Sequence, residues 1–132
     1  RGLIVKFYRK AHFRARIVQE NILKALFKGN RLDGSVFFSL LTLRLRGLII
    51  FNRGWWSLTQ KGRARAMLVI RRHRLWEAYL CFKLNSDPSM VHNSAEQVEH
   101  ILNEQLEKEL DESLDYPTKD PHNQEIFQRP VL

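Results

Sequence analysis

The sequence predicts a mainly α-helical chain that contains one β-hairpin. Two observations support this: apolar residues recur at helical spacing along most of the 132 residues, and one short β-branched and aromatic segment is split by a turn motif. The single cysteine excludes a disulfide framework, and the longest uncharged run, residues 34–43, is about half of what spans a bilayer. We therefore expect a soluble domain suited to a reducing compartment. Because it begins with Arg and carries no signal peptide, we expect a fragment or a processed product.

The first elements are two helices and a hairpin. A helix is expected from about Ala15 to Phe27, where Gly29-Asn30 ends the apolar pattern, and a second over Ser35–Arg46. The runs Leu48–Phe51 and Trp55–Thr59 flank Asn52-Arg53-Gly54, which is the pattern of strand, tight turn and strand. Helices followed by a hairpin favour a winged helix.

The second half of the chain is predicted to be helical. A long helix should run from about Arg63 to Leu84, since this stretch contains neither Pro nor Gly. After the loop Asn85–Ser89, a helix is expected over Val91–Leu102, and Asn103 is placed to cap another that ends at Tyr116-Pro117. This last helix repeats leucine every four residues on one face, at Leu106, Leu110 and Leu114.

Charge divides the chain sharply. Residues 1–84 carry 19 Lys and Arg against three acidic residues, a net charge of +16, whereas residues 85–132 carry three against 11, a net charge of −8. Lys and Arg release counterions from phosphates, so the basic half predicts a polyanion-binding module. A basic surface that only solubilises the domain is the alternative. The basic and aromatic segment 1–16 predicts a juxtamembrane linker, which leaves membrane phosphates open as a third target.

Imidazole and carboxylate side chains gather on two of the predicted helices. His73 and Glu77 lie one helical turn apart, and a second group of four falls on about a quarter of the following helix. Nitrogen and oxygen ligands without thiolate suit Mn(II), Fe(II) or Zn(II), while solvated Glu and His residues are the alternative. Cys81 is expected in the core, and His12 and His122 are assigned no role. The four residues of the second group are His92, Glu96, Glu99 and His100.

Signatures of an enzyme are missing from the sequence. It contains no His-Glu-x-x-His helix, no Gly-rich phosphate loop and no nucleophile elbow. We therefore expect a protein that is not an enzyme.

Several short motifs together resemble the family of the diphtheria-toxin repressor and the manganese repressors. Arg72–Glu77, Val91–Glu96 and Glu99-His100 have the order and spacing of that family's metal ligands. Leu58-Thr59-x-x-Gly62 and Pro117-x-x-Asp120-Pro121-His122 resemble its flanking segments. The resemblance covers residues 20–126 and extends to the repressor domains fused to chlamydial metal ABC-transporter permeases. It implies a winged helix, which is shortened in this chain, joined by a long helix to a helical metal-binding and dimerisation domain.

The resemblance also implies two metal sites. His73, Glu77 and His92 match the family's ancillary site, and Glu96, Glu99 and His100 match its primary site. A further ligand normally comes from the first helix, where Asn21 aligns and the neighbouring Glu20 is the substitute. Glu at position 96 is typical of the manganese type, yet the overall likeness favours Fe(II), with Mn(II) or Zn(II) as alternatives.

The implied function is an Fe(II)-dependent transcriptional repressor of metal-uptake genes that binds operator DNA as a homodimer. The domains would be a linker over 1–16, a winged helix over 17–70, a metal-binding and dimerisation domain over 71–126 and a tail over 127–132. Between Phe27 and Leu48 only about one helix fits where the family usually has two, and it is too apolar to read bases, so phosphate contacts are expected instead. The alternative is a cytoplasmic metal-sensing domain of a transporter permease that does not bind DNA. Either protein would be cytoplasmic, and the repressor would be released there from a membrane-bound precursor. The DNA-binding candidates are Arg31, Arg44, Arg46, Arg53 and Lys61.

Overall fold

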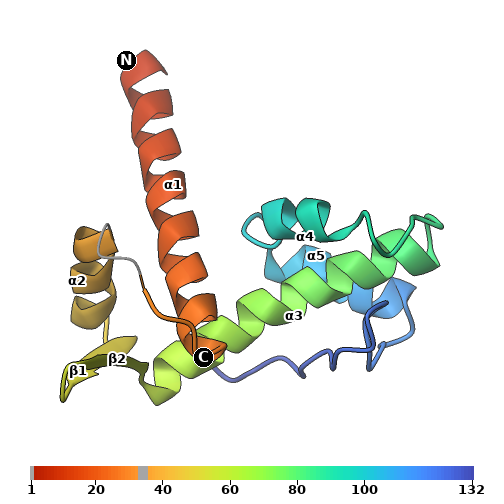
Figure 1. Ribbon diagram of the computed structural model, residues 1–132. Coiled ribbons are helices and arrows are strands. Elements are labelled where there is room, and N and C mark those ends of the chain that lie inside the picture. The colour runs from red at the N-terminus through yellow and green to blue at the C-terminus, as the bar shows by residue number, and fades with distance from the viewer. Residues whose placement is uncertain (1, 33–35) are drawn as a thin grey trace. The chain divides into compact units, whose positions relative to one another are not determined.

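The computed structural model describes residues 2–32 and 36–132, and the chain divides into two compact units. The first unit ends at Ala66, and the second runs from Met67 to Val131. The predicted mainly helical fold with one antiparallel hairpin is confirmed (Figure 1). Its elements are α1 (Gly2–Phe27), α2 (Phe37–Leu45), β1 (Ile49–Asn52), β2 (Trp55–Leu58), α3 (Gln60–Phe82), α4 (His92–Val98) and α5 (Glu104–Ser113).

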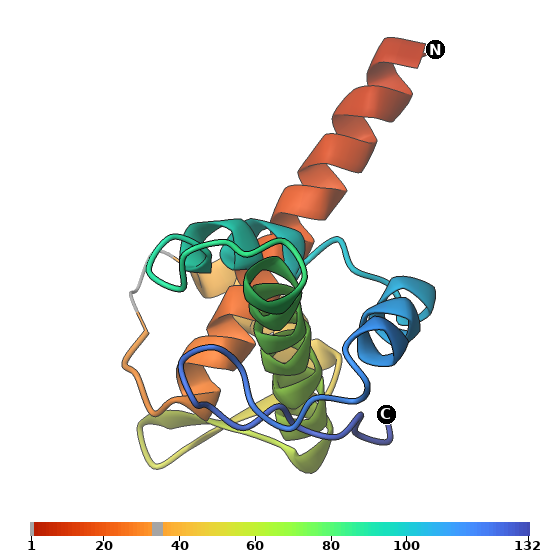
Figure 2. The ribbon, with the colours of Figure 1, turned by 90° about the vertical axis from the view of Figure 1, so that its right-hand side faces the viewer.

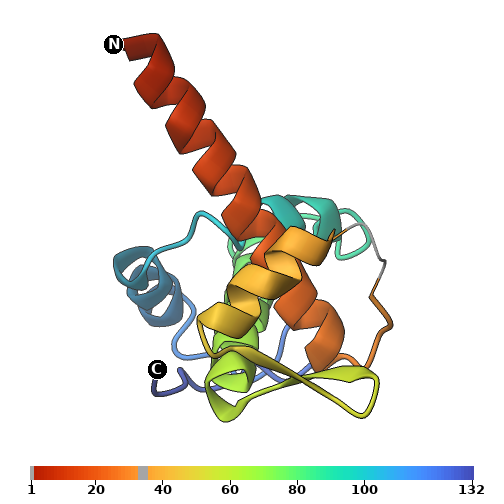
Figure 3. The ribbon, with the colours of Figure 1, turned by 90° about the vertical axis from the view of Figure 1, so that its left-hand side faces the viewer.

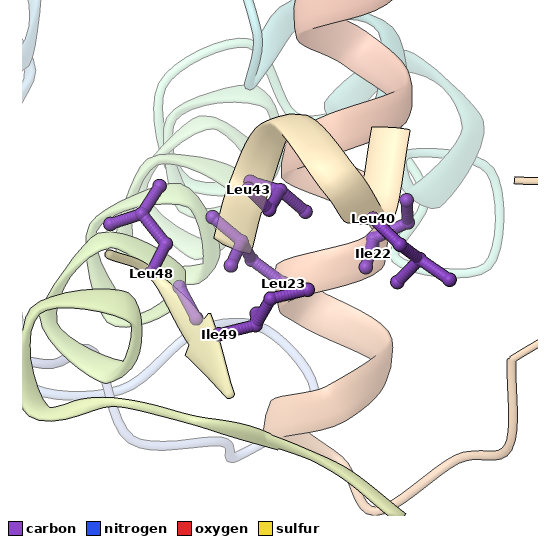
Figure 4. Packing of buried hydrophobic residues seen from close by; sticks show 7 residues of the cluster. Ile22, Leu23, Leu40, Leu43, Leu48 and Ile49 are labelled. Atoms are coloured by element: carbon purple, nitrogen blue, oxygen red, sulfur yellow. The ribbon is translucent and has the colours of Figure 1, made fainter. Parts of the chain in front are cut away.

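The first unit packs α2 and the hairpin against the C-terminal part of α1. Figure 3 shows α2 lying across α1, with the hairpin beside the end of that helix. Apolar side chains from all three elements meet in one core, with Leu23 at its centre (Figure 4). The buried members of this cluster are Ile22, Leu23, Leu40, Leu43, Leu48, Ile49 and Ala66.

Helix α1 is longer than the sequence pattern predicted. It begins at Gly2 rather than near Ala15, so the segment expected to be a linker is helical, and every residue from Gly2 to Ala15 is exposed. No Pro interrupts residues 3–14, and once a helix is nucleated each further turn adds hydrogen bonds at little cost. At the other end Gly29 adopts φ +77°, and the amides of Gly29 and Asn30 donate to the carbonyls of Leu26 and Ala25. That pairing is the glycine-terminated helix end that the sequence predicted.

The hairpin and the start of α3 depend on two glycines. Arg53 and Gly54 both have positive φ, 52° and 82°, which gives the tight turn that matches the twist of β1 and β2. Thr59 caps α3 by accepting the amide of Gly62 at 3.0 Å. A Cβ at Gly62 would lie 1.9 Å from the carbonyl oxygen of Leu48, so only glycine fits there.

A single helix, α2, lies between α1 and β1 among the described residues. It spans Phe37–Leu45, and the predicted start at Ser35 falls outside the part of the chain that the structure describes. Its outer face is apolar, since Phe38 and Leu45 are each 81% exposed. The described part of this region thus agrees with a shortened winged helix.

The second unit surrounds the C-terminal part of α3 with α4, α5 and the final segment of the chain (Figure 2). Helix α3 begins at Gln60, three residues before its predicted start, and α4 ends at Val98 rather than Leu102. The early end of α4 lets the chain turn, so that Leu102 enters the core and Asn103 caps α5 by accepting the amide of Leu106 at 2.9 Å. The core consists of Leu75, Ala78, Leu102, Leu110 and Ile126.

Buried ion pairs join α3 to α5 and to the C-terminal segment. Glu107 is almost fully buried and accepts from Arg71 at 2.8 Å, Arg72 at 3.0 Å and Arg129 at 2.8 Å. Arg71 also pairs with Asp111 and donates to the carbonyl oxygen of Phe127 at 3.0 Å. The segment expected to be a tail therefore has defined contacts with the rest of the second unit.

Candidate metal centre

Three predicted ligands meet at the buried carboxylate of Glu77 in the second unit. One of its oxygens, Oε1, lies 2.5 Å from His73 Nε2 and 3.0 Å from His92 Nδ1. The two imidazole nitrogens lie 3.2 Å from each other. His73 and Glu77 share a face of α3 because they are four residues apart, and α4 begins at His92. One nitrogen or oxygen from each of these three residues is thus placed around a common point.

The other nitrogens of the two imidazoles face carboxylates. His73 Nδ1 lies 2.5 Å from Glu99 Oε2, and His92 Nε2 lies 3.1 Å from Glu96 Oε1. Glu99 is fully buried, and its second oxygen lies 3.2 Å from His100 Nε2. In the neutral form of each ring, the carboxylate accepts the N–H of the outer nitrogen and a lone pair faces Glu77; in the charged form the inner nitrogen donates to Glu77.

Electrostatics keep Glu77 in its charged form. Burial alone would raise the pKa of Glu77, but the charge of His73 and hydrogen bonds from His92, His73 and His122 together hold that pKa below its usual value. Burial raises the pKa of the Cys81 thiol, and the charge of Glu77 adds to this effect. The site therefore offers a carboxylate and imidazoles, whereas Cys81 stays a thiol.

One residue at this centre was missed by the sequence analysis. His122, from the loop after α5, places Nδ1 2.8 Å from Glu77 Oε2. Burial lowers the pKa of His122, but the hydrogen bond and charge of Glu77, the Pro88 carbonyl and Asp120 raise it overall. The residue is separated from Glu77 by 45 positions, so helical spacing could not link the two. The only sequence signal was the Asp120-Pro121-His122 motif that resembles a family segment.

The six predicted ligands of the second unit form one connected group, with one change from the expected pattern. The helical stripe accounts for His92 and Glu96, but Glu99 follows the last residue of α4 and His100 lies in the turn beyond it. The other two predicted ligands belong to the first unit. On α1, Glu20 is buried and pairs with Arg16 at 2.9 Å, and Asn21 is exposed. Their role as ligands stays a prediction.

The donor set fits a divalent cation. Ligand atoms about 2.1 Å from one ion and at right angles to each other lie about 3 Å apart, close to the distances among His73, Glu77 and His92. The outer carboxylates fix the ring orientation as they do in known metal sites. Imidazole and carboxylate without thiolate suit Fe(II), Mn(II) and Zn(II).

The residues predicted to contact phosphates all lie in the first unit and all are exposed. Arg46 donates to Gln19 at 2.7 Å, and Lys61 donates to the Arg46 carbonyl at 3.4 Å. The Arg31 guanidinium lies over the ring of Trp55, 5.7 Å from its centroid. The other two, Arg44 on α2 and Arg53 in the hairpin turn, complete the five.

The second half of the chain is similar to a known protein family. Residues 59–128 match the model of the iron dependent repressor, metal binding and dimerisation domain, and this segment holds His73, Glu77, His92 and His122. The chain belongs to the iron-dependent repressor family. Its members regulate and are not enzymes, which confirms the expectation from the sequence.

Relatives of this repressor-family chain include larger membrane proteins. A probable metal transport system membrane protein of Chlamydia trachomatis is 42% identical over 92 residues, covering 70% of this chain and 20% of that protein. A protein of the same description from Chlamydia pneumoniae is 33% identical and covers 95% of this chain and 33% of its own length. The chain thus spans a fifth to a third of these relatives. The helices described here include none that is long and apolar enough to cross a membrane.

Solved structures of metal-responsive repressors share the fold. A manganese-dependent transcriptional repressor in complex with manganese superposes with a TM-score of 0.72 at 28% identity, covering 82% of this chain and 57% of that one. ScaR with bound Zn²⁺ superposes with a TM-score of 0.75 at 26% identity, covering 84% of this chain and 60% of that one. The likeness to repressors therefore includes most of the first unit as well.

Proposed function

We propose that this chain is an Fe(II)-dependent transcriptional repressor domain that binds DNA as a metal-stabilised homodimer. The observation that carries the proposal is the pairing, in one chain, of a buried imidazole–carboxylate centre with a unit that exposes five candidate phosphate-binding cations. The centre lies in the segment matched by a metal-binding and dimerisation model.

Fe(II) is the proposed corepressor, with Mn(II) and Zn(II) as alternatives. Their affinities for nitrogen and oxygen ligands follow the Irving–Williams order, so availability in the cell decides among them. The family model is named for iron, and repressors of similar fold are described with manganese and with zinc. His73, Glu77 and His92 would hold the ion, which would supply the positive charge that the buried Glu77 carboxylate requires.

The ligand residues adjoin an apolar groove that suits a second copy of the chain. This groove has a volume of about 540 Å³ and lies between α3, the α4 turn and α5. Glu99 and His100 lie in sequence between two of its lining residues, Val98 and Ile101, so a cation that orders the ligands also orders the groove. Its other apolar lining residues are Trp76, Tyr79, Leu102, Leu106 and Leu110.

Introducing a charged residue into this groove tests whether the groove forms the dimer interface. Ile101 is 57% exposed, and Ile101→Glu should convert a dimer to a monomer in sedimentation velocity because the same face would be buried on both copies. Leu45→Glu is the matched control, since Leu45 is an exposed leucine of the first unit. A dimer that survives Ile101→Glu contradicts this surface.

The proposed dimer would set the spacing of two basic units on DNA. Arg31, Arg44, Arg46, Arg53 and Lys61 would bind phosphates and release counterions. Two such units at a fixed spacing can contact successive turns of the double helix.

The function is tested by removing ligands while keeping the basic surface. The double variant Glu99→Ala/His100→Ala should lose metal-stimulated DNA binding in fluorescence anisotropy, whereas His12→Asn, which changes the histidine of α1, should retain it. Metal-stimulated binding by the double variant would contradict the proposal.

A second function is supported by the apolar outer face of α2. A helix that reads bases presents polar side chains to the groove, whereas α2 exposes Phe37, Phe38, Leu41 and Leu45. Two relatives are described as membrane proteins of metal transport systems. The chain would then be a metal-sensing domain of a transporter that does not bind DNA. Any residual attraction of its basic surface to DNA would be weak, independent of sequence and lost at moderate salt, unlike the binding of a repressor.

A further inference from the structure

The two oxygens of Glu77 face two different sets of ligand atoms. Oε1 faces His73 and His92, as described above, whereas Oε2 lies 2.8 Å from His122 Nδ1. Glu77 is 1% exposed, so neither oxygen is satisfied by bulk water. Each oxygen must therefore find its hydrogen-bond donors or a cation among the groups that surround it in the second unit.

The imidazole of His122 is oriented as a ligand. It donates its Nε2–H to the carbonyl oxygen of Pro88 at 2.9 Å, because a carbonyl oxygen can only accept. In the neutral ring this leaves the Nδ1 lone pair facing Glu77 Oε2, which also carries lone pairs. Without a metal, a proton on Nδ1 joins the two atoms at 2.8 Å; a divalent cation would displace that proton and bind both lone pairs. The side chain is 41% exposed, which gives an ion a path from solvent.

A second carboxylate lies at the same place. Asp120 is buried, and its Oδ1 accepts the amides of His122 at 2.9 Å and Gln124 at 2.8 Å, so the loop is held around this side chain. Glu77, Asp120 and His122 each bring one ligand atom within 4.8 Å of the other two. Together they form a donor set of two carboxylates and one imidazole, separate from the His73 and His92 nitrogens.

We propose that Glu77 bridges two divalent cations, one held with His73 and His92 and the other with Asp120 and His122. The inference deepens the proposed metal-dependent function and rests on it. A carboxylate can bind one metal through each oxygen, and ions about 3.5–4 Å apart are common in two-metal sites. The oxygen-rich second set suits Mn(II), Fe(II) or Zn(II). The second cation would link α3 to the loop after α5 and so close the second unit.

Counting bound Co(II) by native mass spectrometry of the full chain tests the bridge. His122→Asn should bind one Co(II) fewer per chain than the wild type, and so should Asp120→Asn. The latter keeps the oxygen that accepts two backbone amides while it loses the charge, so its fold should be retained. The matched control, His12→Asn, removes a histidine from the first unit and should bind the wild-type number.

A double variant separates two ions from one. If each set holds its own cation, His92→Asn/His122→Asn should bind two Co(II) fewer than the wild type. If the double variant loses no more than either single variant, one shared ion is bound and the bridge is wrong. An unchanged count for His122→Asn, with an unchanged circular dichroism spectrum, also overturns it, since His122 would then only pair with Glu77. A wild-type chain that binds no Co(II) overturns the proposed metal-dependent function as well, so the two failures are distinguishable.

Discussion

The two units of the chain use charge in opposite ways. Up to Ala66, 15 Lys and Arg accompany two acidic residues, a net charge of +13, whereas residues 67–131 hold seven against 12, a net charge of −5. Among the described residues, eight of the nine buried polar or charged side chains lie in the second unit. The second unit pairs its buried charges internally and can therefore hold ligands in fixed positions. The first unit leaves its cations exposed, where they can meet a partner.

The boundary between the two units does not coincide with the boundary between the basic and acidic halves of the sequence. The basic half extended to Leu84 and included Arg71, Arg72 and Arg74. Arg71 and Arg72 are buried against Glu107, and Arg74 donates to the Glu125 carbonyl and lies over the Phe127 ring. These three arginines stabilise the second unit and are not available to phosphates, whereas the five predicted phosphate contacts all lie exposed in the first unit.

The largest expected effect comes from removing the buried acid of the second unit. Glu107→Ala leaves Arg71 and Arg72 buried without their carboxylate and should lower the free energy of unfolding by about 3–5 kcal/mol. Denaturant unfolding gives the value, and hydrogen exchange should show lost protection in residues 67–131. The exposed Glu112→Ala on the same helix should change stability by less than about 0.5 kcal/mol. If Glu107→Ala and Glu112→Ala lower the free energy of unfolding equally, the buried ion pairs of Glu107 do not stabilise the second unit.

A glycine substitution should damage the first unit instead. Gly62→Ala forces a Cβ against the Leu48 carbonyl and should cost about 3 kcal/mol, with faster hydrogen exchange in the hairpin. Co(II) binding by the second unit should persist. Gly2→Ala is the control, because no atom lies within 4 Å of its added Cβ. If Gly62→Ala loses Co(II) binding as well as protection of the hairpin, the metal site of the second unit depends on the first unit, which contradicts this expectation.

Glu99, whose carboxylate orients the His73 ring, should increase the metal affinity of the centre. Glu99→Ala removes the acceptor that faces His73 Nδ1 and should weaken Co(II) binding about 10- to 100-fold in isothermal titration. Glu109→Ala, an exposed acid of α5, should leave the affinity unchanged. An unchanged affinity in Glu99→Ala would mean that the His73 ring is fixed by its other contacts.

The smallest effect concerns the cap of α5. Asn103→Ala loses the side-chain oxygen that accepts the Leu106 amide and should cost about 1 kcal/mol, measured as a lower thermal midpoint. Asn103→Ser, which can still cap, should recover most of the loss. If serine does not recover it, the residue stabilises α5 in another way.

Local features of the sequence predicted most of the elements. Asn52-Arg53-Gly54 located the hairpin, Asn103 located α5, and the four-residue spacing of His73 and Glu77 located half of the candidate centre. Features that depend on distant residues were not predictable. Arg71 and Glu107 are 36 positions apart, and no periodicity connects them. The spacing predicted that α4 extends to Leu102, but the helix ends at Val98. The chain turns there and buries Leu102, and such tertiary packing is not visible in local spacing.

We propose that a metal bound in the second unit governs DNA binding by the first. The most direct measurement is anaerobic fluorescence anisotropy of the chain with DNA from upstream of its own gene and with scrambled DNA, with and without Fe(II). From this proposal we expect binding that requires Fe(II), prefers the upstream sequence and survives moderate salt. Fe(II) binding without any preference between the two DNAs would contradict it and indicate a transporter sensor.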